Sequence, residues 1–191
     1  RAVRPLRKIE VDGAMDLALL MLNDLLDIGQ AEQAALQTDI SEVDMEPLLA
    51  RLKGLFQVHT RSRGILLEYR VSPESARLAT DRNLVFRVLV NLVSNAIKAS
   101  PKKDTISIEC AAYQGGTRFS VADRGPGIPN ERKGRIFEKY STGDRKTGTG
   151  IGLAFCRVAS QALKGRIRVE DRPGGGSLFI VDLPPAKVEA P

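Results

Sequence analysis

The sequence has few aromatic residues, two cysteines, one histidine and no tryptophan. With so few aromatic residues, a core must be built mainly from aliphatic side chains. Cys110 and Cys156 each lie in an apolar segment, so we expect two buried thiols rather than a disulfide, and a reducing, cytoplasmic setting. No apolar run approaches the length of a membrane span, and no signal-peptide pattern opens the chain. We therefore expect no membrane contact by this segment.

The net charge of +6 could favour nucleic acid, a small anion or an acidic protein. The basic residues are scattered, with a modest concentration over residues 132–146, and no aromatic residues are interleaved at a spacing that would stack bases. We therefore expect a nucleotide or an acidic partner, and no nucleic acid. The length of 191 residues suits one domain, or one domain with a helical appendage.

Apolar spacing of three to four residues predicts helices, and alternation predicts strands. Asp44 and Asp81 are expected to cap two of the helices, and Gly64 to end the first of these. Residues 38–44 are expected to be a polar connector and hinge. The predicted helices are 13–36, 44–61, 81–100 and 151–163, and the predicted strands are 65–71, 76–80, 105–113, 117–123, 166–170 and 177–183. Glycine-rich turns join the last four strands into two hairpins. This order predicts an α/β sandwich, with a mixed sheet covered by helices on one face.

The helix over 13–36 is apolar on much of its circumference. Such a helix needs more than one neighbour, and the sequence supplies no second long helix to cover it. We expect either dimerisation or a partner helix outside this chain.

Asn91, Asn95 and Lys98 follow one another at helical spacing, so they line one polar stripe on an otherwise apolar helix. Carboxamide oxygens are hard ligands that suit Mg²⁺, and an ammonium suits a phosphate beside that metal. On this helix alone, the stripe is equally consistent with the solvated face of an amphipathic helix.

Asp123 ends a predicted strand and is followed by Gly125 and Gly127 within Asp123-Arg124-Gly125-Pro126-Gly127. An acidic side chain at a strand end, beside tight glycine backbone, is a typical ligand position. Asp123 could accept a hydrogen bond from an exocyclic amine and so select adenine. Taken alone this motif is weak, because Gly-Pro-Gly also makes a plain turn.

The run Gly148-Thr149-Gly150-Ile151-Gly152-Leu153 opens the predicted helix that ends at residue 163. Its free backbone N–H groups and helix start would favour phosphates. It lacks the Gly-Lys-Ser/Thr of a Walker A loop and the spacing of a dinucleotide-binding loop. Residues 139–147 before it are polar, basic and contain glycine, which is typical of a mobile lid over a nucleotide.

These motifs, in this order and together with Phe137-Glu138-Lys139-Tyr140, resemble those of the GHKL (Bergerat-fold) ATPases, and within them the catalytic domains of bacterial sensor histidine kinases. Residues 87–100 are similar to the N box, 123–129 to the G1 box, 136–140 to the F box and 148–153 to the G2 box. The ending Gly-Gly-Gly-Ser-Leu-Phe-Ile-Val-Asp-Leu-Pro is similar to the final hairpin. The resemblance covers about residues 44–185. It implies a two-layer sandwich in which a largely antiparallel five-stranded sheet packs on about three helices, preceded by a long N-terminal helix.

The resemblance also implies roles for individual residues. Asn91 and Asn95 would hold Mg²⁺ against the ATP phosphates, Lys98 would contact a phosphate, and these three would be the catalytic residues. Asp123 would bind the adenine amine, and Ser177 would place a hydroxyl near it. The cofactors would be ATP and Mg²⁺, and an Asn at position 91, where related ATPases carry a Glu base, favours phosphoryl transfer over hydrolysis. The remaining nucleotide-binding positions would be Gly125, Gly127, Lys139, Tyr140, Gly148, Thr149, Gly150, Ile151, Gly152 and Leu153.

Residues 1–43 resemble the second helix and hinge of the dimerisation and phosphotransfer hairpin, residues 44–185 the ATP-binding catalytic domain, and 186–191 a disordered tail. The phosphoacceptor histidine of that family has no counterpart in residues 1–12, and His59 has the wrong flanking pattern for an acceptor. The expected function is ATP-dependent phosphorylation of a histidine outside this chain, in a homodimeric parent that serves a response regulator. The alternatives are a non-catalytic nucleotide-sensing module that regulates a partner, and a serine kinase of the anti-sigma type.

Overall fold

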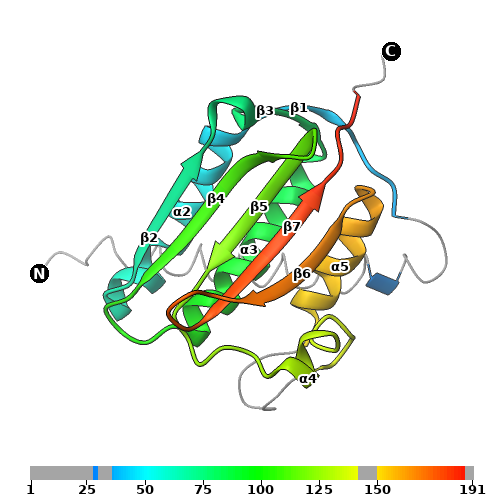
Figure 1. The fold of residues 1–191 in the computed structure, drawn as a ribbon. Coiled ribbons are helices and arrows are strands. Elements are labelled where there is room, and N and C mark those ends of the chain that lie inside the picture. Colours follow the sequence, from blue (N-terminus) through cyan, green and yellow to red (C-terminus); the bar gives the residue numbers. More distant parts are fainter. Residues whose placement is uncertain (1–27, 30–35, 142–149, 188–191) are drawn as a thin grey trace, which may run out of the picture.

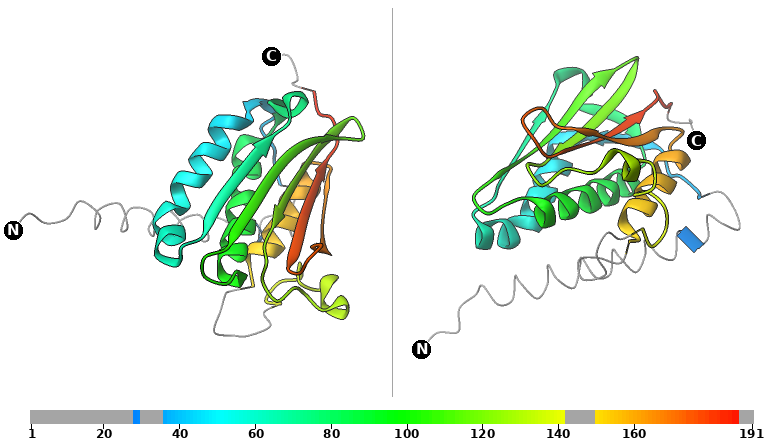
Figure 2. Two further views of the ribbon diagram at one scale, coloured as in Figure 1. Left: turned by 60° about the vertical axis from the view of Figure 1, so that its left-hand side comes forward. Right: turned by 60° about the horizontal axis from the view of Figure 1, so that its bottom comes forward.

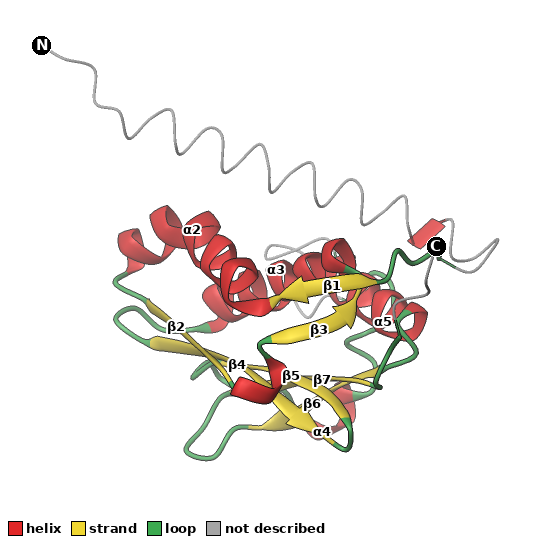
Figure 3. Ribbon diagram, turned by 90° about the horizontal axis from the view of Figure 1, so that it is seen from above, coloured by secondary structure: helices red, strands yellow, loops and turns green. Residues whose placement is uncertain are grey.

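The computed structural model describes residues 28–29, 36–141 and 150–187, and these form two layers. One layer is a five-stranded sheet of β2 (Leu66–Val71), β4 (Thr105–Tyr113), β5 (Gly116–Ala122), β6 (Arg166–Asp171) and β7 (Ser177–Leu183), in the order β2-β4-β5-β7-β6. The other layer contains α2 (Met45–Arg63), α3 (Arg82–Ala99) and α5 (Gly152–Ala162), which lie behind the sheet in Figure 1 and on one side of it in Figure 3. The opposite face of the sheet carries none of these helices.

The sheet is mixed because β2 runs parallel to β4, whereas the other three strand pairs are antiparallel. The two hairpins predicted from the glycine-rich turns, β4–β5 and β6–β7, are both present. The expected fold class, a two-layer sandwich of a largely antiparallel sheet and about three helices, is therefore confirmed.

Helix α2 begins after Asp44 and ends at Gly64, as predicted. Gly64 has a φ of 66°, a left-handed conformation that glycine adopts without a steric penalty. The expected capping role of Asp44 is wrong, because its side chain makes no cap hydrogen bond. Its Oδ1 instead accepts a hydrogen bond from Nε of Arg77 at 2.8 Å.

Helix α3 crosses the domain beneath the sheet, and Asp81 caps it as predicted. Oδ1 of Asp81 accepts hydrogen bonds from the backbone N–H groups of Asn83 at 2.9 Å and Leu84 at 3.0 Å. Oδ2 of the same carboxylate accepts from the backbone N–H of Asp39 at 2.9 Å. At the other end of the helix, the guanidinium of Arg63 donates to the carbonyl of Ile97 and to that of Ser100, the latter at 2.7 Å. Both ends of α3 are thus fixed by charged side chains.

The connector expected at residues 38–44 is partly a strand, and this prediction is wrong. Strand β1 (Ser41–Asp44) pairs antiparallel with β3 (Arg77–Thr80) in a separate two-stranded sheet. The strand predicted over 76–80 therefore exists but lies outside the main sheet. Val43 is the one buried residue of β1, so the sequence offered too little apolar alternation to predict it.

Two short elements were also not predicted, namely a 3₁₀ turn at Pro73–Ser75 and α4 (Asn130–Lys133), which lies at the lower end of β6 in Figure 1. The predicted helix over 13–36 lies mostly outside the described residues, as does the end of the tail. The predicted aliphatic core is present, with Cys110 and Cys156 buried in it as thiols that form no disulfide. No helix among the described residues is long and apolar enough to cross a membrane. His59 is exposed on α2.

Figure 2 shows the sheet from two further sides. The uncovered face of the sheet bears a cluster of charged side chains at one end. Asp182 of β7 is only 8% exposed and is contacted by three arginines from the two neighbouring strands. Its carboxylate accepts hydrogen bonds from Nε of Arg118 at 2.6 Å, Nε of Arg166 at 3.3 Å and Nη1 of Arg168 at 2.5 Å. Burial alone would raise the pKa of Asp182, but the arginines lower it overall.

Candidate functional site

The polar stripe predicted on α3 is present, and its residues become more exposed along the helix. Asn91 is buried, Asn95 is half-buried and Lys98 is exposed. Nδ2 of Asn91 donates to the backbone carbonyl of Arg87 at 3.0 Å, which fixes the orientation of the carboxamide. Its Oδ1 then faces Gly152, at the start of α5, so closely that a Cβ on Gly152 would lie 2.3 Å from it. The stripe and the glycine-rich helix start therefore meet.

The donor set on this stripe suits a hard cation next to an anionic ligand. A carboxamide held with its oxygen toward a helix start fits Mg²⁺, which is bound through a few protein oxygens and otherwise by phosphates and water. The surroundings of Lys98 desolvate its ammonium and lower its pKa, although much of the side chain reaches solvent. An anion placed beside this ammonium would compensate the lost hydration.

Asp123 directly follows β5 and is 1% exposed. Its Oδ1 accepts hydrogen bonds from the backbone N–H groups of Gly125 at 2.8 Å and Ser177 at 3.3 Å. Among the described residues no hydrogen bond reaches Oδ2. Burial raises the pKa of Asp123, with a smaller contribution from the charge of Asp104, while the two N–H groups and Arg172 act in the opposite direction. The carboxylate thus has one oxygen fixed and one available to a ligand with an N–H donor.

Two glycines bring Asp123 into contact with α3 and with the turn before β7. A Cβ on Gly125 would lie 2.9 Å from the Cβ of Ala99, so the loop after Asp123 packs directly on the end of α3. A Cβ on Gly176 would lie 2.0 Å from the carbonyl oxygen of Asp123, and Gly176 has a φ of 104°. Only glycine fits at these two close approaches.

The predicted F-box region is anchored to β7, because the ring of Phe137 packs edge-on against Phe179 at a centroid distance of 6.4 Å. Lys139 and Tyr140 after it are exposed. The backbone N–H of Tyr140 donates to the carbonyl of Gly150 at 3.2 Å, and a Cβ on Gly150 would lie 2.7 Å from the Cα of Tyr140. Residues 140 and 150, which flank the segment 142–149, are therefore in direct backbone contact.

Of the other predicted site residues, Gly148 and Thr149 lie outside the described residues, and the rest have defined positions. Ile151 and Leu153 are half-buried against the core at the start of α5, and Gly127 has a φ of 75° in the loop after Asp123. The backbone N–H of Ser177 donates to Oδ1 of Asp123, and the expected place of its hydroxyl near the adenine stays a prediction. Sequence reasoning missed Gly176, although three consecutive glycines before a strand were a signal for a close approach.

A family model described as "Histidine kinase-, DNA gyrase B-, and HSP90-like ATPase" matches residues 80–187, which contain α3, Asp123 and the start of α5. The chain belongs to this ATPase family. The match includes every predicted nucleotide-binding position, and it shows that this part of the chain is an ATP-binding domain of this family.

The proteins similar to this chain include a sensor protein and a histidine kinase. The chain is 32% identical over 175 residues to the alginate biosynthesis sensor protein KinB of Pseudomonas aeruginosa, covering 91% of this chain and 29% of KinB. It resembles full-length ShkA in complex with AMPPNP with a TM-score of 0.79 and 29% identity, over 100% of this chain and 41% of ShkA. It also resembles the catalytic domain of the histidine kinase ThkA, with a TM-score of 0.71 and 32% identity, over 78% of this chain and 97% of that domain.

The chain covers different fractions of the lengths of these relatives. The chain spans 29% of KinB, but it spans nearly the whole isolated ThkA domain. The likeness to the family is therefore a likeness to its catalytic part.

Proposed function

We propose that the chain binds ATP with Mg²⁺ and transfers the γ-phosphoryl group to a histidine that lies outside this chain, as the catalytic domain of a sensor histidine kinase. The observation that carries the proposal is the meeting of Asn91 with Gly152, together with the buried carboxylate of Asp123, whose loop packs through Gly125 on Ala99 at the end of the same helix. These residues come from three separate segments, all within the range that matches the ATPase family.

Each residue has a physical role in this proposal. Oδ2 of Asp123 accepts the exocyclic N–H of adenine, while Oδ1 keeps the carboxylate in place through Gly125 and Ser177. A guanine carbonyl in the same place would meet a carboxylate oxygen and be rejected. Lys98 contacts a phosphate oxygen, and the glycines that begin α5 bring backbone N–H groups to the triphosphate.

Asn91 and Asn95 are the residues that would hold Mg²⁺. The ion supplies neutralisation of the phosphate charge when it is bound. Because an asparagine cannot remove a proton from water, position 91 favours transfer to a nucleophile that another segment presents. Positioning of the phosphates is then the main task of this chain.

The parent protein is proposed to be a homodimer that passes the phosphoryl group to a response regulator. The matched chain in the structure of ThkA in complex with the response regulator TrrA is 25% identical to this chain. This similarity supports a partner of this class. The division into a partial hairpin at 1–43, a catalytic domain at 44–185 and a tail at 186–191 is part of the same proposal.

The direct test is to mix the chain with a histidine-bearing hairpin fragment and labelled ATP. We expect acid-labile phosphate on the fragment. Nucleotide binding without any transfer would favour a non-catalytic sensing module, and acid-stable phosphoserine on a partner would favour a serine kinase. The similarity to the catalytic domain of the histidine kinase ThkA favours neither alternative.

A sharper test uses Gly152→Ala, which places a methyl group against Oδ1 of Asn91. We expect phosphoryl transfer to fall by about tenfold or more, because displaced ligands misplace the phosphates. The matched control is Gly54→Ala on α2, where an added Cβ meets nothing within 4 Å. That variant should keep its transfer rate and gain about 0.5–1 kcal/mol of stability. Equal transfer rates in both variants would contradict the proposed role of Asn91.

A further inference from the structure

Strand β6 lies at the edge of the main sheet, with β7 as its neighbour on one side. Within the described part of the chain, no strand pairs with its other side. An edge strand presents a row of backbone N–H and C=O groups, which another extended chain can use for pairing.

A groove with a cavity of about 510 Å³ runs beside this edge, between β6, α5 and the segment that follows α4. Its floor is apolar, because Phe137 and Val169 are each 8% exposed there and Ile167 packs against the core. A groove of this kind, next to unpaired strand backbone, has the shape that accepts an extended peptide.

The rim of the groove is cationic. Lys133, Arg157, Arg166 and Arg168 line it, and none of its ten lining residues is acidic. Three of the cations also contact carboxylates outside the lining, namely Asp171 for Lys133, Asp182 for the two β6 arginines, and Glu170 for Arg168 as well. Arg157 is exposed on α5 and makes no ion pair with a described residue. The groove therefore keeps an excess of positive charge.

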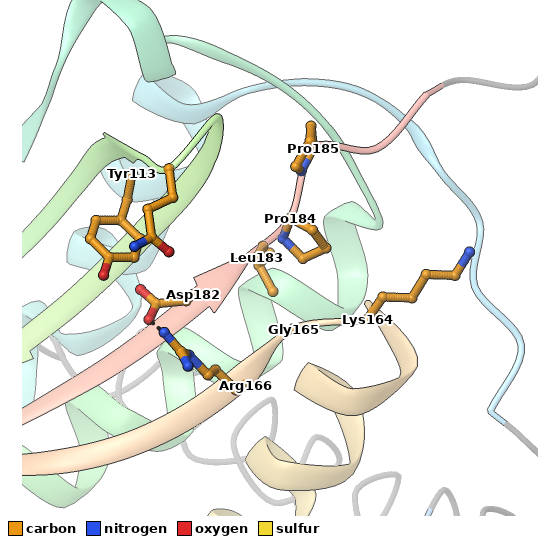
Figure 4. Close-up of a pocket in the computed structure, with 9 residues that line it drawn as sticks. Tyr113, Lys164, Gly165, Arg166, Asp182, Leu183, Pro184 and Pro185 are labelled. Atoms are coloured by element: carbon orange, nitrogen blue, oxygen red, sulfur yellow. Dashed lines mark hydrogen bonds and ion pairs between the residues drawn. The ribbon is translucent and has the colours of Figure 1, made fainter.

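A further lysine lies just before the start of β6. A second cavity of about 430 Å³ shares Gly165 and Arg166 with the first and is also lined by Lys164 and Asp182. Figure 4 shows Arg166 beside Asp182, whereas the side chain of Lys164 points away from it. Both cavities thus flank the same edge strand.

Along β6 the two kinds of side chain alternate. Arg166 and Arg168 point to the uncovered face of the sheet, beside Asp182, whereas Ile167 and Val169 pack toward the helices. A strand added beside β6 would alternate in the same way, with one set of side chains beside the arginines and the other beside the apolar floor.

We propose that the β6 groove binds an acidic segment of a protein partner as an added strand, with acidic and apolar residues alternating along it. Charge complementarity selects the acidic set, and the backbone edge and apolar floor select a polypeptide. A nucleic acid would use the arginines but not the strand edge or the floor. The groove contains none of the residues proposed to bind the nucleotide, so the two proposals stand or fall separately.

The probe is a fluorescein-labelled peptide of eight residues in which Glu and Val alternate, titrated with the whole chain and followed by anisotropy. We expect saturable binding that weakens as salt rises, and no binding of the matched Lys and Val peptide. In NMR hydrogen exchange, the peptide should slow the β6 amides that do not bond to β7.

Arg157→Glu should weaken peptide binding by roughly fivefold or more. The matched control is Lys53→Glu, which makes the same charge change at an exposed position on α2 and should bind as the parent does. Thermal melting, measured in both variants, shows that the domain is folded.

Backbone pairing is tested with two peptides that are N-methylated at alternate residues. One should lose binding, because its methyl groups face β6, and the other should keep it. Equal binding of both, equal weakening by the two variants, or absence of binding would overturn the proposal. Competition by double-stranded DNA or anionic vesicles, with no effect of N-methylation, would assign the surface to those ligands instead.

Discussion

Asp123 and Asp182 lie near opposite ends of the same pair of strands, and burial raises the pKa of both. Their pKa values nevertheless shift in opposite directions, because their partners differ. Asp123 receives two backbone N–H groups on one oxygen, whereas Asp182 receives three guanidinium groups across both oxygens. The first carboxylate keeps capacity for a ligand, and the second is saturated.

This difference shows how burial alone fails to distinguish a binding carboxylate from a structural one. Full hydrogen bonding stabilises the charged form and leaves nothing for a ligand. A buried carboxylate with an unfilled oxygen and a raised pKa is a candidate for function. The comparison predicts that substitutions at the two positions will have separate effects.

The largest expected effect is that of Asp123→Asn on nucleotide affinity. The carboxamide oxygen can still accept from Gly125 and Ser177, but an amide NH₂ then faces the adenine amine. We expect affinity for Mg-ADP to fall by about 100-fold, since a hydrogen bond to a charged group contributes about 1.5–3 kcal/mol. Titration calorimetry measures this. The melting temperature should be unchanged or higher, so a variant that unfolds would place Asp123 with the structural carboxylates.

Asp182→Asn should give the converse result. Removal of the charge leaves three arginines without their shared partner, and we expect a loss of about 1–2 kcal/mol in the free energy of unfolding, because these arginines are partly exposed. Denaturant unfolding measures the loss. Mg-ADP affinity should stay within about twofold of the parent, since the two sites do not share a residue. A large loss of affinity would show that the sites are coupled.

The two carboxylates should also differ in their response to pH. The pKa of Asp123 is raised in the folded protein, so its charge costs stability at neutral pH, and acidification through the folded pKa removes that cost while it weakens adenine binding. The pKa of Asp182 is lowered, so its stabilisation is present above its unfolded value and is lost only as pH falls through the folded value. On acidification, nucleotide affinity should therefore fall before this part of the stability does.

Calorimetry and thermal melting over the same pH series check this order. Asp182→Asn should shift the stability profile and leave the affinity profile where it was. Simultaneous loss of affinity and stability in the parent chain would contradict the difference between the two carboxylates.

The smallest expected effect separates the arginines around Asp182. The side chain of Arg166 is 65% exposed, and Arg166→Ala should cost less than about 0.5 kcal/mol of stability. Arg118 makes two hydrogen bonds to Asp182 and stacks on Tyr113, with 3.3 Å from its Cζ to the ring centroid, so Arg118→Ala should cost about 1 kcal/mol. Denaturant unfolding measures the two losses. A loss for Arg166→Ala as large as that for Arg118→Ala would show that exposure does not decide the contribution.

Features with local signals could be predicted from the sequence. Asp81 stands just before an apolar periodic run, and Gly64 just after one, so the ends of two helices were predictable. The glycine-rich turns predicted both hairpins. Asn91 and Asn95 were found because two carboxamides at helical spacing are unusual on an apolar helix.

Features that depend on strand register could not be predicted in this way. The cluster at Asp182 joins residues 118, 166, 168 and 182 from three strands, and no local pattern brings them together. Strand β1 has a single buried side chain and forms because β3 is available as a partner. The pairing of Ser177 with Asp123 through the backbone is equally invisible in side-chain patterns.

Asp81 joins two parts of the domain with one carboxylate, since it holds both the first turn of α3 and the backbone at residue 39. Asn91 lies ten residues further along helix α3, or about 15 Å at the rise of an α-helix. A displacement of the backbone at residue 39 would therefore act on the first turn of the helix that carries Asn91. Removing the side chain of Asp81 would release both attachments at once.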